Sequence, residues 1–272
     1  MKVIVTGSHG FLGGHLIRHL KKMKSINVVT IDHKNPLDRF KLANTSCVVH
    51  LAGVNRGTKH ELRSGNVKYT KQLLVWLNEF APNASIVFAS SSQVYVKDWF
   101  YGEMKLQAEK VLESYVRKHQ ARCICLRFSN LYGSFCRPFY NSAIATFIYQ
   151  IMHGREFVVN GNGSRKRDFL CVADAIDAIQ KAMFYNPKKA FSVYDICSGS
   201  LVSLKSVIRV LREVSPNPVP FRYESAPKDK PTPKRSNNRA KKDFSWVPVT
   251  PLSDGLRNIF IEEYGIHQNH KH

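Results

Sequence analysis

A phenol and an ammonium stand four residues apart in the segment Tyr101-Gly102-Glu103-Met104-Lys105. On a helix this spacing places both side chains on one face, within reach of a common ligand. Because an ammonium beside a phenol favours the phenolate, Tyr101 would exchange a proton with an alcohol or a carbonyl near neutral pH. The chain contains eleven tyrosines and is rich in lysine, so the pair needs further support before it indicates an active site.

That support comes from three serines, Ser90, Ser91 and Ser92, which follow the apolar run 85–89. The run reads as a buried strand, and active sites of open α/β sheets gather at the carboxyl ends of their strands. A serine hydroxyl at this point would hold the reacting oxygen. Serines that cap a turn are the commoner interpretation in general, so the catalytic one depends on the glycine motif at the start of the chain.

The first 32 residues have the layout of a dinucleotide-binding βαβ unit. Gly7 permits a tight turn after an apolar strand, Gly10 lets backbone N–H groups approach a pyrophosphate, and Gly13 allows the following helix to pack closely. Asp32 ends the second apolar run, where a carboxylate would meet a ribose hydroxyl. A glycine-rich turn without ligand is the alternative, but strand, turn, amphipathic helix and second strand occur here in order.

Further apolar runs predict the strands that position these residues. The runs 47–52, 85–89 and 123–128 alternate with helical patterns at 67–77 and 104–116, which predicts an α/β fold with a Rossmann-like, doubly wound parallel sheet. The stretch 32–46 is too short for another helix and strand, so we expect a loop there.

Beyond Tyr132 the alternation is interrupted, which predicts a smaller C-terminal α/β lobe for the substrate. We predict a dinucleotide-binding domain over 1–134, to which 165–198 returns, and a substrate lobe formed by 135–164 and 199–272. The expected elements beyond Tyr132 are helices at 142–152, 173–183 and 204–211 and strands at 157–159, 193–197 and 221–223.

Composition narrows the classes of function. Forty-one Lys and Arg against twenty Asp and Glu give a net charge of +21, which favours anionic partners. The densest basic stretch, 228–242, contains prolines but no interleaved aromatic residues, so we do not expect nucleic-acid binding. Six cysteines without a CxxC pair indicate buried thiols rather than zinc or disulfides, and we expect no metal. No apolar stretch is long enough for a membrane span or a signal sequence, so we expect a cytoplasmic protein.

The chain as a whole resembles the extended short-chain dehydrogenases/reductases, the NAD(P)-dependent epimerases, dehydratases and reductases of nucleotide sugars. Within that family it is most similar to the reductase domain of capsular-polysaccharide enzymes in the UDP-N-acetyl-L-fucosamine pathway. Those enzymes carry an additional cupin domain, so the resemblance supports the reductase half alone. The segments that carry the resemblance are TGSHGFLG (6–13), VVHLAG (48–53), HLAGVNR (50–56), GNVKYT (65–70), ASSSQVY (89–95), YGEMK (101–105), RFSNLYG (127–133), PFYNSAIATFIYQI (138–151), GNGSRKRDFLCVADA (161–175) and DFSWVPVTPLSDGL (243–256).

The resemblance implies roles for individual residues. Tyr101 would be the catalytic acid/base, Lys105 would lower its pKa and hold the nicotinamide ribose, and Ser91 would hydrogen-bond the reacting oxygen. The substrate, including its diphosphate, would contact Ser92, Asn130, Asn141 and Arg167, and a planar guanidinium suits bidentate phosphate binding. A salt bridge with Asp168 is the alternative for Arg167. The predicted cofactor contacts are Gly7, His9, Gly10, Phe11, Leu12, Gly13, Asp32, His33, Lys34, Leu51, Ala52, Gly53 and Lys105.

Which reaction is catalysed depends on the residues around Ser91. Related 4,6-dehydratases carry Asp-Glu after the active-site Ser/Thr, whereas this chain has Ser92-Gln93, and an amide cannot cycle protons. We therefore predict an NAD(P)H-dependent reductase of a nucleotide-linked 4-keto-6-deoxysugar. An NAD-dependent 4-epimerase and a non-catalytic nucleotide-binding regulator are the alternatives.

Two further predictions concern the cofactor and the assembly. Asp32 favours the ribose diol of NAD, whereas His33 and Lys34 would neutralise the 2′-phosphate of NADP, so either cofactor remains open. The resemblance also implies a homodimer formed through the helices at 67–77 and 104–116.

Overall fold

The computed structural model describes residues 1–32, 38–119, 121–140, 142–225, 232 and 234–266, and these divide into two compact units. Unit 1 comprises 1–129, 175–196 and 237–246, and unit 2 comprises 130–174, 197–236 and 247–272.

Unit 1 is built on a six-stranded parallel sheet of order β10-β5-β4-β3-β1-β2, which has the predicted doubly wound topology. The strand order reverses between β1 and β3, and this switch point is where ligands bind in open α/β sheets. The elements of unit 1 are β1 (Lys2–Thr6), α1 (Phe11–Leu20), β2 (Asn27–Ile31), α2 (Arg39–Leu42), β3 (Cys47–His50), α3 (Lys59–Arg63), the π-helix η1 (Ser64–Lys68), α4 (Tyr69–Phe80), β4 (Ser85–Ser91), the 3-10 helix η2 (Ser92–Tyr95), α5 (Phe100–Lys118), β5 (Cys123–Phe128), α7 (Val172–Phe184), β10 (Phe191–Ile196) and α9 (Asn238–Phe244).

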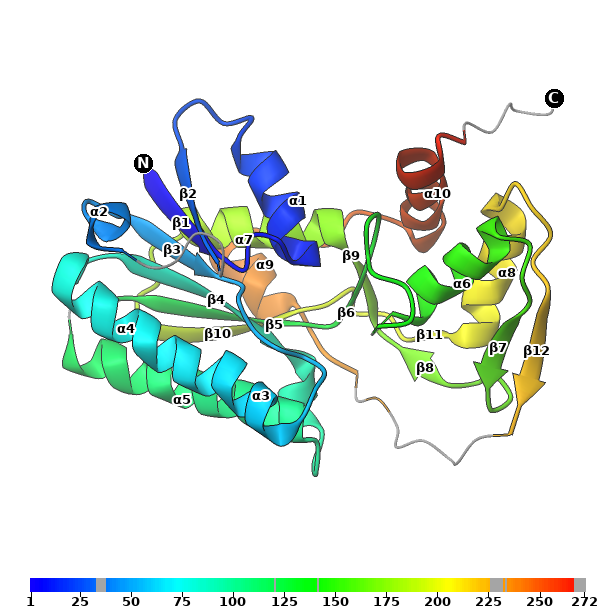
Figure 1. Ribbon diagram of the computed structural model, residues 1–272, viewed down its shortest axis with the longest axis horizontal. Helices are drawn as coiled ribbons and strands as arrows, with labels where there is room; N and C mark the ends of the chain where they lie inside the picture. Colours follow the sequence, from blue (N-terminus) through cyan, green and yellow to red (C-terminus); the bar gives the residue numbers. More distant parts are fainter. Residues whose placement is uncertain (33–37, 120, 141, 226–231, 233, 267–272) are drawn as a thin grey trace. The chain divides into compact units, whose positions relative to one another are not determined.

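Helices cover both faces of this sheet. Figure 1 shows α1 and α7 over one face and α3, α4 and α5 over the other. One core cluster joins alternate residues of the strands, including Ile4, Ile86 and Phe88, to buried leucines of α4 and α5 such as Leu77 and Leu112. Strands buried on both faces explain why the sequence of each one reads as a continuous apolar run.

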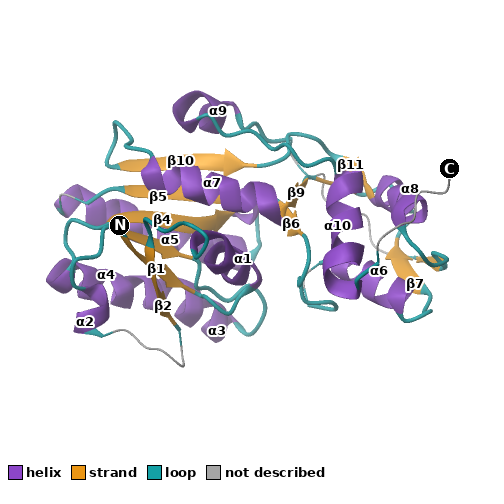
Figure 2. Cartoon of the chain, turned by 90° about the horizontal axis from the view of Figure 1, so that it is seen from above, coloured by secondary structure: helices purple, strands orange, loops and turns teal. Residues whose placement is uncertain are grey.

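Unit 2 is smaller and mixed in structure. Its core packs Phe147, Phe157, Val207 and Phe260 together, so three helices and a two-stranded sheet share one apolar interior. Figure 2 distinguishes its helices from its short strands. The elements of unit 2 are β6 (Asn130–Tyr132), α6 (Ala143–Met152), β7 (Phe157–Asn160), β8 (Lys166–Arg167), β9 (Phe169–Cys171), β11 (Val202–Ser203), α8 (Leu204–Val214), β12 (Phe221–Glu224) and α10 (Leu252–Tyr264).

The observed units differ from the predicted domains in four segments, since 130–134, 165–174 and 197–198 belong to unit 2 and 237–246 belongs to unit 1. Residues 237–246 belong to unit 1, because Tyr194 of β10 donates a hydrogen bond to Asp243 at 2.8 Å and Phe244 packs on its ring. Residues 165–174, which we expected to return to the dinucleotide domain, belong to unit 2, since β8 pairs with β11 and β9 with β6. The predicted loop at 32–46 also contains the short helix α2.

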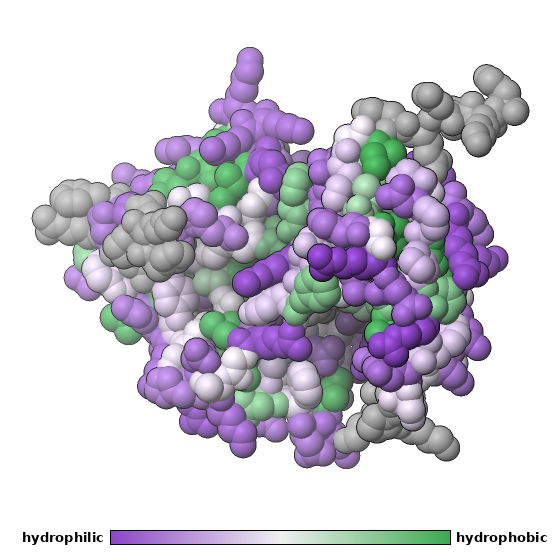
Figure 3. Space-filling view, turned by 45° about the vertical axis from the view of Figure 1, so that its right-hand side comes forward, coloured by the Kyte–Doolittle hydropathy of each residue, from purple (hydrophilic) through white to green (hydrophobic). Residues whose placement is uncertain are grey.

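On the face shown in Figure 3, hydrophilic residues are spread among smaller groups of hydrophobic ones. Within the described part of the chain, no helix combines the length and the apolar character needed to cross a membrane. All six cysteine side chains are buried, which agrees with the predicted buried thiols.

Candidate dinucleotide-binding and catalytic site

The glycine loop between β1 and α1 brings three backbone segments closer together than side chains would allow. Gly7 has a φ of +74°, and a Cβ added there would lie 2.6 Å from the backbone nitrogen of Ala52. A Cβ on Gly13 would collide with the carbonyl oxygen of Gly7. Gly10, in extended conformation, caps the N-terminus of α1. The first turn of α1 therefore lies directly on the loop, an arrangement that presents backbone N–H groups to an anion.

Asp32 lies against this loop at the end of β2. Its carboxylate, 6% exposed, accepts a hydrogen bond from the hydroxyl of Ser8 at 2.7 Å and lies 3.0 Å from Nδ1 of His9. The structure thus brings Asp32 and His9 together, whereas His33 and Lys34 lie outside the described residues. Ser8 was not predicted, although a hydroxyl directly after Gly7 is well placed to orient a carboxylate on the next strand.

Phe11 and Leu12 occupy the first two positions of α1, and Leu51 follows β3. The ring of Phe11 contacts that of His15 edge-on, with 5.3 Å between centroids. The backbone N–H of Leu51 donates to the carbonyl of Thr6 at 3.2 Å, so β3 continues beside β1 up to the glycine loop. These three predicted cofactor contacts therefore lie on the elements that follow β1 and β3.

His50, a buried residue that was not predicted as part of the site, connects Thr6 of β1 to Thr70 of α4. Thr70 donates to the carbonyl of Asn66 at 2.5 Å, so its oxygen must accept from Nε2–H of His50 at 2.9 Å. Nδ1 of His50 then accepts from the hydroxyl of Thr6 at 2.7 Å, which in turn accepts the N–H of Ala52. Burial, ahead of a nearby positive charge, lowers the pKa of His50 to about 3 and keeps this chain of hydrogen bonds in one direction.

Gly53 lies between an unpaired acceptor and an ammonium. A Cβ added to Gly53 would lie 2.7 Å from Oδ1 of Asn66 and 3.1 Å from Nζ of Lys105. The amide nitrogen of Asn66 donates to two backbone carbonyls, but its buried Oδ1 has no hydrogen-bond partner among the described residues. A buried polar atom without a partner calls for an explanation such as a bound ligand, so these residues fit a dinucleotide cofactor. Asn66 is a second residue that the prediction missed, although it stands in the motif GNVKYT.

The candidate catalytic residues come from β4 and α5. Lys105 is 4% exposed, and its Nζ donates to the carbonyl of Ala89 at 2.9 Å. Tyr101 is half-buried one helical turn earlier and packs beside the apolar cluster that contains Met104. Ser91 ends β4, where its hydroxyl accepts the N–H of Gln93 at 3.2 Å.

The close packing of α5 on η2 explains how these residues share one region. A Cβ added to Gly102 would collide with the carbonyl oxygen of Gln93, so the first turn of α5 rests on the backbone directly after Ser92. Ser92 is the first residue of η2. Ser90, by contrast, is buried and donates to Glu109, which leaves Ser91 as the better candidate to meet a substrate.

The buried position of Lys105 predicts a pH dependence for the site. Burial lowers the pKa of Lys105 from 10.5 to about 8, so its ammonium is progressively lost as pH rises through about 8. If the ammonium supports catalysis, we expect kcat/KM to fall on this alkaline side. Lys105→Arg, which stays charged, should retain activity to higher pH, and measuring kcat/KM from pH 6 to 10 for both proteins tests this. An identical alkaline limb in the two proteins would contradict it.

Two of the predicted substrate residues, Arg167 and Asn130, lie in unit 2, whereas Ser92 lies in unit 1. Nη1 of Arg167 donates to the carbonyl of Lys166 at 3.0 Å and to the hydroxyl of Thr232 at 2.6 Å. The buried carboxylate of Asp168 accepts the N–H groups of Ser198 and Gly199. The guanidinium of Arg167 is therefore held by its neighbour Lys166 and by Thr232.

Asn130 begins β6, which pairs with β9, the strand that follows Arg167 in the sequence. Its side chain donates to the carbonyl of Asp168 at 3.0 Å. This amide therefore connects β6 to the segment that carries Arg167. Asn141 lies outside the described residues.

Fold and site together define a protein of the short-chain dehydrogenase/reductase class. A six-stranded parallel sheet carries the glycine loop at its switch point, and the Tyr101–Lys105 pair lies on the helix that packs beside Ser91 at the end of β4. The chain belongs to the NAD dependent epimerase/dehydratase family, whose model matches residues 3–197. The predicted family, the fold class and the dependence on a nicotinamide dinucleotide are thereby confirmed.

Relatives in this family include reductases and epimerases. A UDP-2-acetamido-2,6-beta-L-arabino-hexul-4-ose reductase from Pseudomonas aeruginosa is 31% identical over 209 residues, which cover 74% of this chain and 56% of that protein. An uncharacterised UDP-glucose epimerase from Bacillus subtilis, YtcB, is 26% identical over 309 residues, covering 95% of this chain and 96% of that protein. The solved structure of MoeE5 in complex with UDP-glucuronic acid and NAD has a TM-score of 0.86 at 26% identity, covering 98% and 100% of the two chains.

Proposed function

We propose that this chain is an NAD(P)H-dependent reductase that acts on the keto group of a nucleotide-linked 4-keto-6-deoxysugar. The observation that carries the proposal is the Tyr101–Lys105 pair on the helix that packs beside Ser91 at the end of β4. The similarity to the Pseudomonas aeruginosa reductase supports the choice of reaction. The chain spans little more than half the length of that relative, so the similarity supports this reaction and not any other activity of the longer protein.

Ser91, Tyr101 and Lys105 have separate roles in the proposed reduction. When bound, the reduced nicotinamide supplies a hydride to the keto carbon. Ser91 holds the keto oxygen by a hydrogen bond, and the hydroxyl of Tyr101 gives that oxygen a proton, so that the ketone becomes an alcohol. The ammonium of Lys105 stabilises the phenolate that remains until solvent reprotonates it. Gly7, Gly10 and Gly13 would hold the cofactor pyrophosphate through backbone N–H groups, and Asn66 and Lys105 would contact the nicotinamide half.

The substrate's nucleotide would be held by unit 2. Arg167 carries a planar guanidinium suited to a diphosphate, and Asn130 donates a hydrogen bond to the carbonyl of the next residue, Asp168. Asn141 and Ser92 stay predicted substrate contacts. The homodimer through the helices at 67–77 and 104–116 likewise stays a prediction.

Product analysis by NMR tests the proposed reaction. Purified protein would be supplied with UDP- and dTDP-linked 4-keto-6-deoxysugars together with NADH or NADPH. We expect oxidation of the cofactor and a product with a new C4 hydroxyl of one configuration. If no member of the panel is reduced with either cofactor, the proposal fails.

A 4-epimerase is the second candidate, favoured by the similarity to YtcB of Bacillus subtilis, an uncharacterised UDP-glucose epimerase that matches over 95% of this chain. An epimerase returns the hydride to its substrate and so retains its cofactor. Tightly bound NAD that purifies with the protein, together with interconversion of UDP-sugars without added NADH, would select this candidate over the reductase.

Asp32 should influence the choice between NAD and NADP. Its buried carboxylate would repel a 2′-phosphate at the adenosine ribose, so Asp32→Asn should shift the ratio of dissociation constants towards NADPH by about tenfold, or roughly 1.4 kcal/mol. Fluorescence titration with NADH and NADPH measures the ratio. The matched control is Asp38→Asn, which removes the same charge from a 41% exposed side chain paired with Lys41 and should leave the ratio unchanged. Equal ratios for wild type and Asp32→Asn would contradict the role of Asp32.

A further inference from the structure

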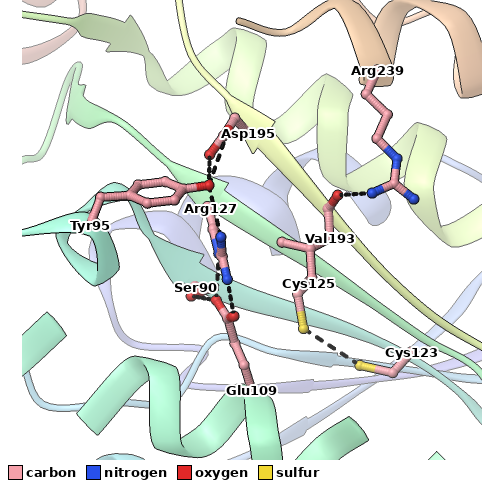
Figure 4. Close-up of polar contacts among 9 residues, drawn as sticks. All are labelled: Ser90, Tyr95, Glu109, Cys123, Cys125, Arg127, Val193, Asp195 and Arg239. Carbon is pink, nitrogen blue, oxygen red and sulfur yellow. Dashed lines mark hydrogen bonds and ion pairs between the residues drawn. The ribbon is translucent and has the colours of Figure 1, made fainter. Parts of the chain in front are cut away.

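A buried carboxylate on α5 connects the catalytic helix to the strand that ends in Ser91. Glu109 is 3% exposed and accepts a hydrogen bond from the hydroxyl of Ser90 at 2.5 Å. Its two oxygens also accept from Nε and Nη2 of Arg127 at 2.9 and 2.5 Å. This two-pronged geometry fixes the orientation of the carboxylate as well as its position. Figure 4 shows the three side chains converging from β4, α5 and β5.

The same network continues to the chain segment that follows Ser91. Nη1 of Arg127 donates to the hydroxyl of Tyr95 at 2.7 Å, and that hydroxyl donates to the carboxylate of Asp195 at 3.0 Å. Tyr95 is the last residue of η2, so polar contacts hold the chain at Ser90 and again at Tyr95. Ser91 lies between these two points.

Helix α5 contacts the end of β4 through two successive turns. Lys105 donates to the carbonyl of Ala89, and Glu109, one turn later, accepts from Ser90. Tyr101 lies one turn before Lys105, so the three residues repeat every four positions along one side of the helix. Displacing Glu109 would therefore shift the turns that carry Lys105 and Tyr101 relative to Ser91.

We propose that Glu109, held by Ser90 and Arg127, is the positioning residue of the catalytic site, fixing α5 on the end of β4 and supplying the negative charge that Lys105 faces. This inference rests on the proposed reaction for its kinetic consequence alone. Its electrostatic consequence, the effect of Glu109 on the titration of Lys105, can be measured in the protein without substrate or cofactor.

Several charged and titratable groups surround Lys105, and their effects differ in sign. Burial lowers the pKa of Lys105, whereas Glu109 and, more weakly, Cys125 of β5 raise it. His50 of β3 interacts with Lys105 as well but is neutral at working pH. The guanidinium of Arg127 is directed to Glu109, so it offsets part of the carboxylate's charge. Removing the carboxylate of Glu109 would therefore lower the pKa of Lys105 further.

The first test measures the titration of Lys105 directly in the cofactor-free protein. The ¹³Cε resonance of labelled lysine would be followed against pH, with Lys105 assigned from its absence in Lys105→Arg. We expect the midpoint of Lys105 to fall by roughly half a pH unit or more in Glu109→Gln, and to stay unchanged in Glu109→Asp, which keeps the charge. The matched control is Glu113→Gln, also on α5, whose partner Arg117 is exposed. An unchanged midpoint in Glu109→Gln would overturn the electrostatic part of the proposal.

The second test separates position from charge. Ser90→Ala removes the contact between β4 and Glu109 but leaves the Glu109–Arg127 ion pair in place. We expect kcat to fall about tenfold, with the dissociation constant for the cofactor and the titration of Lys105 unchanged. Ser90→Ala also decides the matter if Glu109→Gln does not fold, because wild-type kcat in Ser90→Ala would overturn the positioning role.

The two proposals fail in different ways. A protein that reduces no keto sugar but shows the expected shift of Lys105 in Glu109→Gln would contradict the reductase and retain the electrostatic role of Glu109. An active reductase in which neither Glu109→Gln nor Ser90→Ala changes the titration or kcat would contradict the role of Glu109 and retain the reaction.

Discussion

Tyr101→Phe should lower kcat by roughly 10²–10⁴-fold, the usual range for loss of a general acid, while leaving the dissociation constant for the cofactor unchanged. The substitution removes one oxygen atom and keeps the ring that packs in the apolar cluster of α3, η1 and α5. Because the phenol is the proton donor in the proposed reaction, its loss affects the chemical step and not the fold. Steady-state kinetics, fluorescence titration with NADH or NADPH, and thermal unfolding measure the three quantities.

The matched control is Tyr223→Phe, which removes a hydroxyl from a 47% exposed tyrosine of unit 2. We expect its kcat to equal that of wild type. If Tyr101→Phe also turned over at the wild-type rate, the chain would be better described as a nucleotide-binding regulator, or its proton donor would have to be another residue. A loss of cofactor binding together with kcat would instead indicate that Tyr101 supports the fold of the site.

Much of the fold could be predicted because its signals are local. The strands of unit 1 are buried on both faces and read as apolar runs, and the glycine loop and the Tyr–Lys pair are short motifs in continuous sequence. Helix α9 gives no such signal, because it is only 7 residues long and buries just Ala240 and Phe244. Its place in unit 1 comes from contacts such as Tyr194 to Asp243, which lie far apart in the sequence.

In the candidate site, too, some residues follow from local motifs and others depend on contacts between distant parts of the chain. Gly7, Gly13 and Asp32 follow from a spacing rule, whereas Ser8 becomes interpretable once its hydroxyl is seen to meet a carboxylate on the next strand. His50 bonds to two threonines, on β1 and on α4, and neither is near it in the sequence. A side chain defined by partners on other elements requires the fold, and Glu109, with partners on β4 and β5, is another such case.

Among substitutions that add a single methyl group to α1, Gly13→Ala should disturb the glycine loop most. The new Cβ would overlap the carbonyl oxygen of Gly7, and a backbone atom at a left-handed turn has little freedom to move. Helix α1 must therefore shift away from the loop, which should cost roughly 1–3 kcal/mol of unfolding free energy. Because the shift carries away the N–H groups that would meet the pyrophosphate, we also expect cofactor affinity to fall at least about tenfold.

The neighbouring glycine provides the control. A Cβ on Gly14 would meet no atom within 4 Å apart from its neighbours and the backbone of α1 itself, so Gly14→Ala should keep cofactor affinity and raise helix stability by roughly 0.5–1 kcal/mol. Urea unfolding gives the free energy, and titration with NADH or NADPH gives the affinity. If Gly13→Ala and Gly14→Ala behaved alike, close contact between α1 and the loop would not be required, and the glycine loop would lose its role in holding the dinucleotide. Opposite effects of the same methyl group at adjacent positions would instead locate the requirement at the contact between Gly13 and Gly7.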